Sequence, residues 1–396
     1  MLHRARLLER FYTDLSASAW WLRSAKTVLP EMFKPAALKR LLARRIEGVP
    51  SSLVTHFCVF GIQRVLERER TGSSTALAEQ TLQANRQFCS LVNAKGFGEA
   101  NAIYAFNGAA LEMFESAKER GMLRILEQTS APVEFDERLL AEERMRWHGW
   151  EPGNFNPKDW QPWAQREREE WELADIILCG STHILKTLGE EGGPLDRCAV
   201  VPYGVNARAF TGSPRPRHDR PLRILAVGNI TLRKGFQYLI QAARELRNQG
   251  VVCRVVGQPM VNEAAIRLLQ SELELAGVIA RDRMAEQYAW ADVLVLPSLS
   301  EGSANVCYEA LSCGLPVITT ENAGSVVRDG IDGLIIPIRS SEAIIAAVNR
   351  LDSDRALLAE MAHEAVLRAG EYSWDRYAER LVSVVTGAFE SGHAVA

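Results

Sequence analysis

The stretch "ADVLVLPSLSEGSANVCYEALSCGLPVITT" (residues 291–320) decides the fold. It predicts an apolar strand that ends at Pro297, a loop of small residues, a helix that begins near Asn305, and a second β-branched strand. Two strands joined through a helix form a βαβ unit, which indicates a parallel sheet with right-handed crossovers. Glu301 lies in the loop and Glu309 falls one turn into the helix. The stretch therefore predicts an α/β protein with two carboxylates at the end of a strand.

The same alternation of strands and helices continues along most of the chain. Strands are predicted at 51–60, 100–108, 122–130, 174–182, 198–206, 222–228, 251–257, 291–298, 316–320 and 333–337, and helices over residues 1–50. The segment "TGSPRPRHDRP" (211–221) is rich in Pro, Gly and Arg and predicts a linker. The expected organisation is two doubly wound Rossmann-like domains facing a central cleft, where ligands bind at the carboxyl ends of the strands.

These patterns set the expected domain boundaries. Residues 1–210 form an N-terminal Rossmann-like domain, residues 211–221 form the linker, and residues 222–372 form a C-terminal Rossmann-like domain. Residues 373–396 form a C-terminal helix, with Ser373 as its N-cap, that is expected to pack back on the N-terminal domain.

The overall composition excludes several classes of protein. The 396 residues carry a net charge of −3, which gives no general attraction for nucleic acid. The seven cysteines include no Cys-x-x-Cys pair, so neither a disulfide framework nor a metal site is indicated. No apolar run is long enough to span a bilayer, and a cytoplasmic location is expected.

Several loops at predicted strand ends have related chemistry. Arg233 and Lys234 stand at the start of a helix after Gly228, where two cations and free N–H groups suit a diphosphate; a solvated basic pair is the alternative. Gly257 follows the next strand and permits a close backbone approach or simply forms a turn. Glu301 is expected to reach a ligand hydroxyl. Glu309 would hold a second hydroxyl, unless it is an ordinary first-turn glutamate.

Three segments carry a resemblance to a known family. "AVGNITLRKGF" (226–236), the stretch 291–320 and "RDGIDGLIIP" (328–337) resemble the C-terminal domain of the family-4 glycosyltransferases, the retaining GT-B enzymes called glycosyl transferases group 1. "ADIILCGSTHILKTL" (174–188) followed by "AVVPYGVNARAF" (199–210) is similar to the end of their N-terminal domain. The resemblance covers residues 174–389 well and the preceding residues thinly.

The resemblance implies a retaining, metal-independent hexosyltransferase that uses a nucleotide-diphosphate sugar as co-substrate and no cofactor. It implies a glycan or lipid-linked acceptor, in the synthesis of a surface polysaccharide or glycolipid. Arg233 and Lys234 would neutralise the diphosphate, and Glu301 would bind hydroxyls of the transferred sugar. Glu309 would bind the ribose. The other donor-binding positions are Gly228, Asn229, Gly257, Ile279, Arg281, Ser303, Ala304, Asn305 and Val306.

The sequence departs from the family at two places. Asn229 occupies a position where members commonly have Arg, so Arg233 is expected to supply the second positive charge. The first strand of the family and its glycine-rich loop are not recognisable. Either that strand is missing or "HFCVFGIQ" (56–63) takes its role with Gly61. A non-hydrolysing nucleotide-sugar epimerase and a non-catalytic nucleotide-sugar-binding protein therefore remain as alternatives.

The acceptor side has weaker candidates. His56, Gly61, Glu127 and Gln128 lie at or near predicted strand ends, although a packed histidine is the simpler interpretation of His56. Residues 1–70 carry thirteen Lys and Arg against six Asp and Glu, an excess of seven. The basic helix predicted at 34–46 fits an anionic membrane surface or a solvated face, and the sequence leaves both open.

Overall fold

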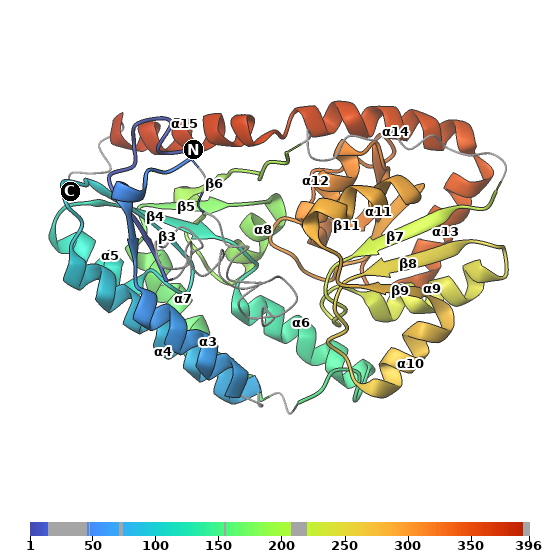
Figure 1. The fold of residues 1–396 in the computed structure, drawn as a ribbon, viewed down its shortest axis with the longest axis horizontal. Helices are drawn as coiled ribbons and strands as arrows, with labels where there is room; N and C mark the ends of the chain where they lie inside the picture. The colour runs from blue at the N-terminus through green and yellow to red at the C-terminus, as the bar shows by residue number, and fades with distance from the viewer. Residues whose placement is uncertain (15–45, 47, 71–73, 154–155, 207–219, 391–396) are drawn as a thin grey trace, which may run out of the picture. The chain divides into compact units, whose positions relative to one another are not determined.

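The computed structural model describes residues 1–14, 46, 48–70, 74–153, 156–206 and 220–390 (Figure 1). The chain divides into two compact units. The first contains Met1–Glu127, Asn154–Ile177 and Val382–Ala396, and the second contains Gln128–Gly153 and Leu178–Leu381. The predicted domain boundaries stay a prediction. Most of the predicted linker, and residues 34–45 of the basic helix predicted at 34–46, lie outside the described residues.

The second unit is built on a six-stranded sheet in which every pairing is parallel. Its strands lie in the order β12-β11-β10-β7-β8-β9. Their bounds are β7 Arg223–Val227, β8 Val252–Val256, β9 Glu274–Gly277, β10 Val293–Leu296, β11 Val317–Thr320 and β12 Gly333–Ile336. The chain moves outward from β7 to β9 and returns to β10 on the other side of β7. These two central strands therefore form a topological switch point, where sheets of this kind bind ligands.

Helices cover both faces of this sheet because alternate strand residues point to opposite sides (Figure 1). Ile224 of β7 packs in one core cluster with α9, α10 and α13, whereas Leu225 packs in another with α11, α12 and the end of α14. The helix bounds are α9 Phe236–Arg247, α10 Glu263–Glu272, α11 Met284–Trp290, α12 Asn305–Ser312, α13 Ser341–Ser353 and α14 Arg355–Gly370. The predicted parallel α/β architecture is confirmed here, although β9 was not predicted.

Helix α6 (Val133–Arg146) comes from the first half of the sequence but belongs to the second unit. Its Glu143 is fully buried and accepts hydrogen bonds from Gln237 Nε2 (3.0 Å), the Tyr238 hydroxyl (2.9 Å) and Arg339 Nε (2.6 Å). Trp150, just beyond the helix, is buried in the same core cluster as α9. Helix α6 is thus held to the six-stranded sheet by both apolar and ionic contacts.

The other strands form a second sheet and a strand pair. The four-stranded sheet has the order β3-β4-β5-β6, with bounds β3 Ala102–Phe106, β4 Leu123–Gln128, β5 Ile176–Cys179 and β6 Cys198–Val200. The pair is β1 (Phe11–Thr13) with β2 (Val54–His56), which run parallel. The remaining helices are α3 Cys58–Arg70, α4 Ser74–Lys95, α5 Leu111–Glu119, α7 Gln161–Leu173, α8 Thr182–Glu190 and α15 Trp374–Glu390.

The structure corrects the prediction for the N-terminal residues. Phe11–Thr13 form a strand where a helix was predicted, because Tyr12 stacks on Phe57 with ring centroids 6.0 Å apart and aromatic residues favour strands. The strand predicted at 51–60 is limited to Val54–His56, since α3 begins at Cys58. Gly61 therefore lies inside a helix, so its predicted role in a glycine-rich loop is wrong.

The C-terminal helix α15 is confirmed with its predicted cap. Ser373 Oγ accepts a hydrogen bond from the Arg376 N–H at 3.2 Å, as an N-cap does. No described helix combines the length and the apolar character that are needed to cross a membrane.

Candidate functional site

The candidate site lies at the switch point, where the loops after β7 and β10 meet. Lys234 Nζ lies 2.6 Å from Glu301 Oε1, and Arg233 Nη1 lies 3.5 Å from Glu301 Oε2. The Ser298 hydroxyl also donates to Glu301 at 3.2 Å. The structure therefore brings together the three residues that were predicted to be catalytic. It does so because β7 and β10 are hydrogen-bonded neighbours whose carboxyl ends lie at the same sheet edge.

The loop that carries Glu301 is held by hydrogen bonds to its backbone carbonyl groups. Four carbonyl oxygens of the loop accept hydrogen bonds: Ser298 O from Thr320 Oγ1 (2.5 Å), Leu299 O from Asn322 Nδ2 (2.8 Å), Ser300 O from Arg233 Nη1 (2.8 Å) and Gly302 O from Ser181 Oγ (2.5 Å). The Glu301 N–H in turn donates to Asn322 O at 2.9 Å. Four donors from three different segments thus fix the loop before any ligand binds, which is the kind of preorganisation that catalysis requires.

Two glycines permit close backbone contacts around the site. Gly257 has a φ of +154°, and a Cβ placed on it would lie 1.9 Å from Gly228 O. A Cβ on Gly302 would lie 1.8 Å from Thr129 O. The close approach predicted for Gly257 is thus an approach to the Gly228 backbone, and its contact with a donor stays a prediction.

Glu309 occupies a second, separate polar site on α12. Its side chain is buried and accepts hydrogen bonds from the Tyr288 hydroxyl at 2.8 Å and from Arg281 Nη2 at 3.2 Å. Burial and the neighbouring Glu309 charge raise the pKa of Tyr288 well above its usual value. Arg281 is mostly exposed and Ile279 is partly buried beside this group. Glu309 and Arg281, two of the predicted donor-binding residues, are therefore in contact, and their roles toward a donor stay a prediction.

The N-terminus of α12 lies between these two glutamates. The helix begins at Asn305, as predicted, and its N-cap residue Ala304 has no side chain that could accept a hydrogen bond. The Cys307 N–H donates to Ala304 O at 2.9 Å, which leaves the N–H groups of Asn305 and Val306 for an anion. The Ser303 hydroxyl lies 2.9 Å from the Tyr308 hydroxyl, which leaves the backbone as the binding element here.

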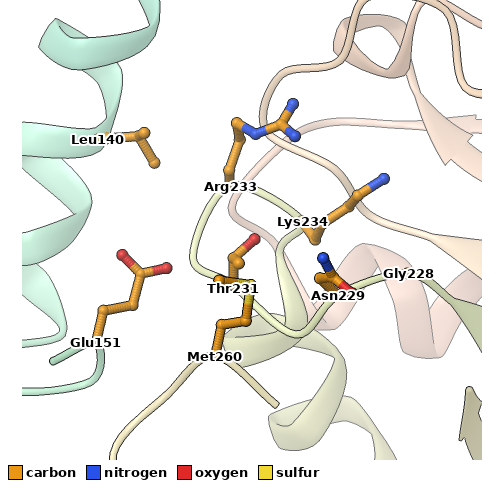
Figure 2. Close-up of a pocket in the computed structure, with 8 residues that line it drawn as sticks. All are labelled: Leu140, Glu151, Gly228, Asn229, Thr231, Arg233, Lys234 and Met260. Carbon is orange, nitrogen blue, oxygen red and sulfur yellow. The ribbon is translucent and has the colours of Figure 1, made fainter. Parts of the chain in front are cut away.

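A pocket of about 490 Å³ opens beside the basic pair (Figure 2). It is lined by residues of the 228–234 loop, including Asn229 and Thr231, and by Leu140, Glu151 and Met260. Glu151 lies across the pocket from Arg233 and Lys234, and its Oε1 accepts a hydrogen bond from the Leu232 N–H at 2.7 Å. Burial raises the pKa of Glu151. The pocket thus combines a carboxylate, two cations and a small apolar wall.

Several site residues were missed in the sequence, and three of them surround the Glu301 loop. Besides Ser181, His183 Nε2 lies 3.4 Å from Ser300 Oγ, and burial lowers the pKa of His183 to about 4, so its ring is neutral at pH 7. Asp136, in the first turn of α6, interacts with the Ser300 hydroxyl, and burial raises its pKa to about 6. In the sequence, these three residues could have been found as polar residues at or shortly after the ends of the strands predicted at 122–130 and 174–182.

The predicted acceptor-side residues have other partners. Glu127 is buried and accepts a hydrogen bond from the Tyr104 hydroxyl. Gln128 is buried and donates to Ser130 O at 3.1 Å. His56 ends β2, and burial lowers its pKa. Their acceptor role stays a prediction. Within the described residues, no group of three His, Cys, Asp or Glu side chains is placed to hold a metal ion.

Comparisons with known proteins support the resemblance seen in the motifs. Residues 221–354 match the family described as Glycosyl transferases group 1. The D-inositol 3-phosphate glycosyltransferase of Geodermatophilus obscurus is 32% identical over 243 residues, which cover 55% of this chain and 53% of that protein. The lipopolysaccharide 1,2-N-acetylglucosaminetransferase of Salmonella typhimurium is 29% identical over 54% of this chain and 63% of its own. The chain spans about half the length of the curated relatives it matches.

Solved structures support the fold. Sucrose-phosphate synthase from Thermosynechococcus elongatus superposes with a TM-score of 0.63 at 19% identity, over 79% of this chain and 80% of its own. HepE of Anabaena, solved with UDP and glucose, superposes with a TM-score of 0.59 at 15% identity, over 84% of this chain and 91% of its own. The predicted resemblance to glycosyl transferases group 1 and the α/β fold of the GT-B type are therefore confirmed.

Proposed function

We propose that this chain is a retaining, metal-independent glycosyltransferase that moves a sugar from a nucleotide-diphosphate sugar to a hydroxyl acceptor. The observation that carries the proposal is the group formed by Arg233, Lys234 and Glu301 at the switch point of the six-stranded sheet. Cations for a diphosphate and a carboxylate for sugar hydroxyls lie within 4 Å of one another there. The match of residues 221–354 to the glycosyltransferase family supports the same activity.

Each part of the donor has a matching element in the second unit. The diphosphate binds to Arg233, Lys234 and the open N–H groups of α12. The transferred sugar binds Glu301, whose carboxylate is an acceptor for its hydroxyls. The ribose binds Glu309, and the base lies against the segment 279–281. Because Asn229 is neutral, Arg233 supplies the second positive charge.

The chemistry depends on stabilising a leaving group. The bond between the anomeric carbon and the diphosphate oxygen breaks, and the acceptor oxygen bonds to that carbon on the same face. The acceptor proton passes to the departing diphosphate, which leaves as an anion. Arg233, Lys234 and the α12 N-terminus stabilise this charge, and one well-placed group of that kind contributes about 3–4 kcal/mol.

The acceptor belongs to the class of glycans or lipid-linked glycans, and the product to a surface polysaccharide or glycolipid. The similarity to the Salmonella lipopolysaccharide enzyme supports this class. An anionic membrane surface is proposed as a further partner through the basic segment 34–46.

The first test is calorimetric titration of the full chain with UDP-glucose, ADP-glucose, GDP-mannose and dTDP-glucose in EDTA, followed by a transfer assay with lipid extracts. We expect one nucleotide sugar to bind and to be transferred with its anomeric configuration kept, as read by NMR. Lys234→Ala should lower kcat by about 10²–10³-fold, while Lys118→Ala, which removes an exposed lysine near the end of α5, serves as the matched control. Conversion of the donor without an acceptor would indicate an epimerase, and binding without turnover a binding protein.

A further inference from the structure

We propose that Glu151 is a sugar-binding residue, which accepts hydrogen bonds from the hydroxyls of a sugar in the pocket beside the basic pair. This inference rests on the proposed function, whose donor-binding elements leave Glu151 without a role. The sugar is either the one that is transferred or the one that receives it, and separate donor and acceptor measurements distinguish the two. All residues that line this pocket belong to the second unit.

Glu151 reaches the pocket from the segment that follows α6. The residue is partly exposed and lines the pocket on the side opposite Thr231 (Figure 2). Two hydrogen bonds hold it there: the Asn262 N–H donates to Trp150 O at 2.8 Å, and the Leu232 N–H donates to Glu151 Oε1 at 2.7 Å. Trp150 itself is buried in the core. The carboxylate is therefore fixed in position at a surface that a ligand can reach.

Three polar side chains of the pocket still have hydrogen-bonding capacity. Among the residues that the structure describes, none donates to Glu151 Oε2, and none bonds to the side chains of Asn229 and Thr231. Lys234, in contrast, already pairs with Glu301 at 2.6 Å. A carboxylate oxygen, an amide and a hydroxyl thus line one pocket together, and a few convergent polar groups of this kind orient a small ligand.

The chemistry of these groups selects a ligand with hydroxyls. An ionised carboxylate only accepts hydrogen bonds, so the ligand partner of Glu151 has to be a donor. An ammonium group is disfavoured, because Arg233 and Lys234 stand across the same pocket and repel a third cation. The Thr231 hydroxyl and the Asn229 amide both donate and accept, as sugar hydroxyls do. Neighbouring hydroxyls of a neutral sugar therefore match all three side chains.

The size and the place of the pocket fit a sugar ring. Its volume of about 490 Å³ lies within the range of small-ligand sites. Leu140 and Met260 form an apolar wall against which the C–H face of a ring can pack. Of the described residues, Arg233 and Lys234 line the pocket and Glu309 does not. The pocket therefore adjoins the proposed diphosphate site, where the transferred sugar and the acceptor meet.

The test compares Glu151→Gln and Thr231→Val with the wild-type chain. Calorimetry at pH 7.5 compares UDP-glucose with UDP, ADP-glucose with ADP, GDP-mannose with GDP and dTDP-glucose with dTDP. Initial rates at saturating donor give the half-saturating concentration of the lipid extract that serves as acceptor.

Two results support the inference and identify the sugar. If the pocket holds the transferred sugar, Glu151→Gln should weaken binding of the nucleotide sugar about tenfold and Thr231→Val about fivefold, since hydrogen bonds are lost. The free diphosphate should then bind within twofold of wild type, because it lacks the sugar. If the pocket holds the acceptor sugar, donor affinity should stay within twofold, and the half-saturating concentration of the extract should rise by the same factors.

Controls separate binding from a structural role. Glu151→Gln keeps a side-chain oxygen that accepts the Leu232 N–H, so the loop stays in place. Glu263→Gln removes a carboxylate that is 91% exposed and lies outside the pocket, and it should change none of these values. An equal loss for nucleotide sugar and free diphosphate would make Glu151 only a support of the loop and overturn the inference. Unchanged donor affinity together with an unchanged half-saturating concentration would overturn it too. Failure of the wild-type chain to bind or to transfer any nucleotide sugar would instead refute the proposed function itself.

Discussion

Replacing Glu143 by Ala should destabilise the second unit strongly. The Glu143 carboxylate is fully buried and accepts hydrogen bonds from Gln237, Tyr238 and Arg339. Removing it leaves the Arg339 cation and two polar groups without their buried acceptor. Breaking a buried ion pair in this way typically lowers the free energy of unfolding by about 3–5 kcal/mol.

The expected change in melting temperature follows from the size of the unit. One kcal/mol shifts the melting temperature by roughly 2–4 °C for a domain of 150–250 residues, so Glu143→Ala should lower it by roughly 6–20 °C. Tryptophan fluorescence during heating reports on this region, because the Trp147 ring lies 5.8 Å from that of Tyr238. Glu142→Ala is the matched control: Glu142 is half-exposed and also pairs with Arg339, at 2.9 Å. It should change the free energy of unfolding by less than about 1 kcal/mol.

Equal melting temperatures for Glu143→Ala and Glu142→Ala would refute this reasoning. The result would mean that α6 is not held to the six-stranded sheet by the buried network. The placement of Asp136 beside the Glu301 loop would then lose its structural basis, since Asp136 lies on the same helix.

Two further predictions concern single groups at the site. Gly257→Ala should weaken donor binding at least tenfold and lower the melting temperature, because the new Cβ would lie 1.9 Å from Gly228 O. Gly277→Ala is the control: Gly277 has a φ of +68° and no atom within 4 Å of the new Cβ. This variant should lose only the roughly 1 kcal/mol of stability that backbone strain costs. Asp136→Asn should stabilise the chain at neutral pH. Burial raises the pKa of Asp136 from 3.8 to about 6. The contribution of this carboxyl to the free energy of unfolding therefore falls as the pH rises from about 4 to about 6 and is constant above pH 6. At 1.36 kcal/mol per pH unit the variant gains at most about 3 kcal/mol above pH 6, and urea unfolding at pH 4 and pH 7.5 measures it. A variant less stable than wild type at pH 7.5 would contradict this sign.

The C-terminal half of the fold was predictable because its local and long-range signals agree. Buried strands such as Val293–Leu296 are continuous apolar runs, and the helix that starts at Asn305 follows a loop of small residues. Glycines end several of the strands. A segment can be predicted from its sequence when its secondary-structure propensity, its hydrophobic pattern and its turn residues all indicate the same structure. The edge strand β9 was missed because Glu274–Gly277 is short and mostly polar.

The grouping of Arg233, Lys234 and Glu301 was predictable for the same reason, whereas the residues around Ser300 were not. Arg233, Lys234 and Glu301 follow strands that are central in one sheet, so strand order alone brings them together. Asp136, Ser181 and His183 reach the same loop from α6 and α8, and their proximity depends on tertiary contacts across more than a hundred residues of sequence. No periodicity encodes a contact of that kind.

The same contacts explain why a loop of small residues can hold a carboxylate in place. Residues 298–304 are buried, with Leu299 and Ala304 packed in the core, and donors from Thr320, Asn322, Arg233 and Ser181 hold the backbone carbonyl groups of the loop. Three of these belong to the six-stranded sheet and its loops, and the fourth is the N-cap of α8. Because Arg233 both holds this loop and faces the proposed diphosphate site, a bound diphosphate and the orientation of Glu301 depend on one side chain. A diphosphate bound as proposed would therefore be coupled to the orientation of Glu301 at the proposed sugar site, as transfer of a sugar from its leaving group requires.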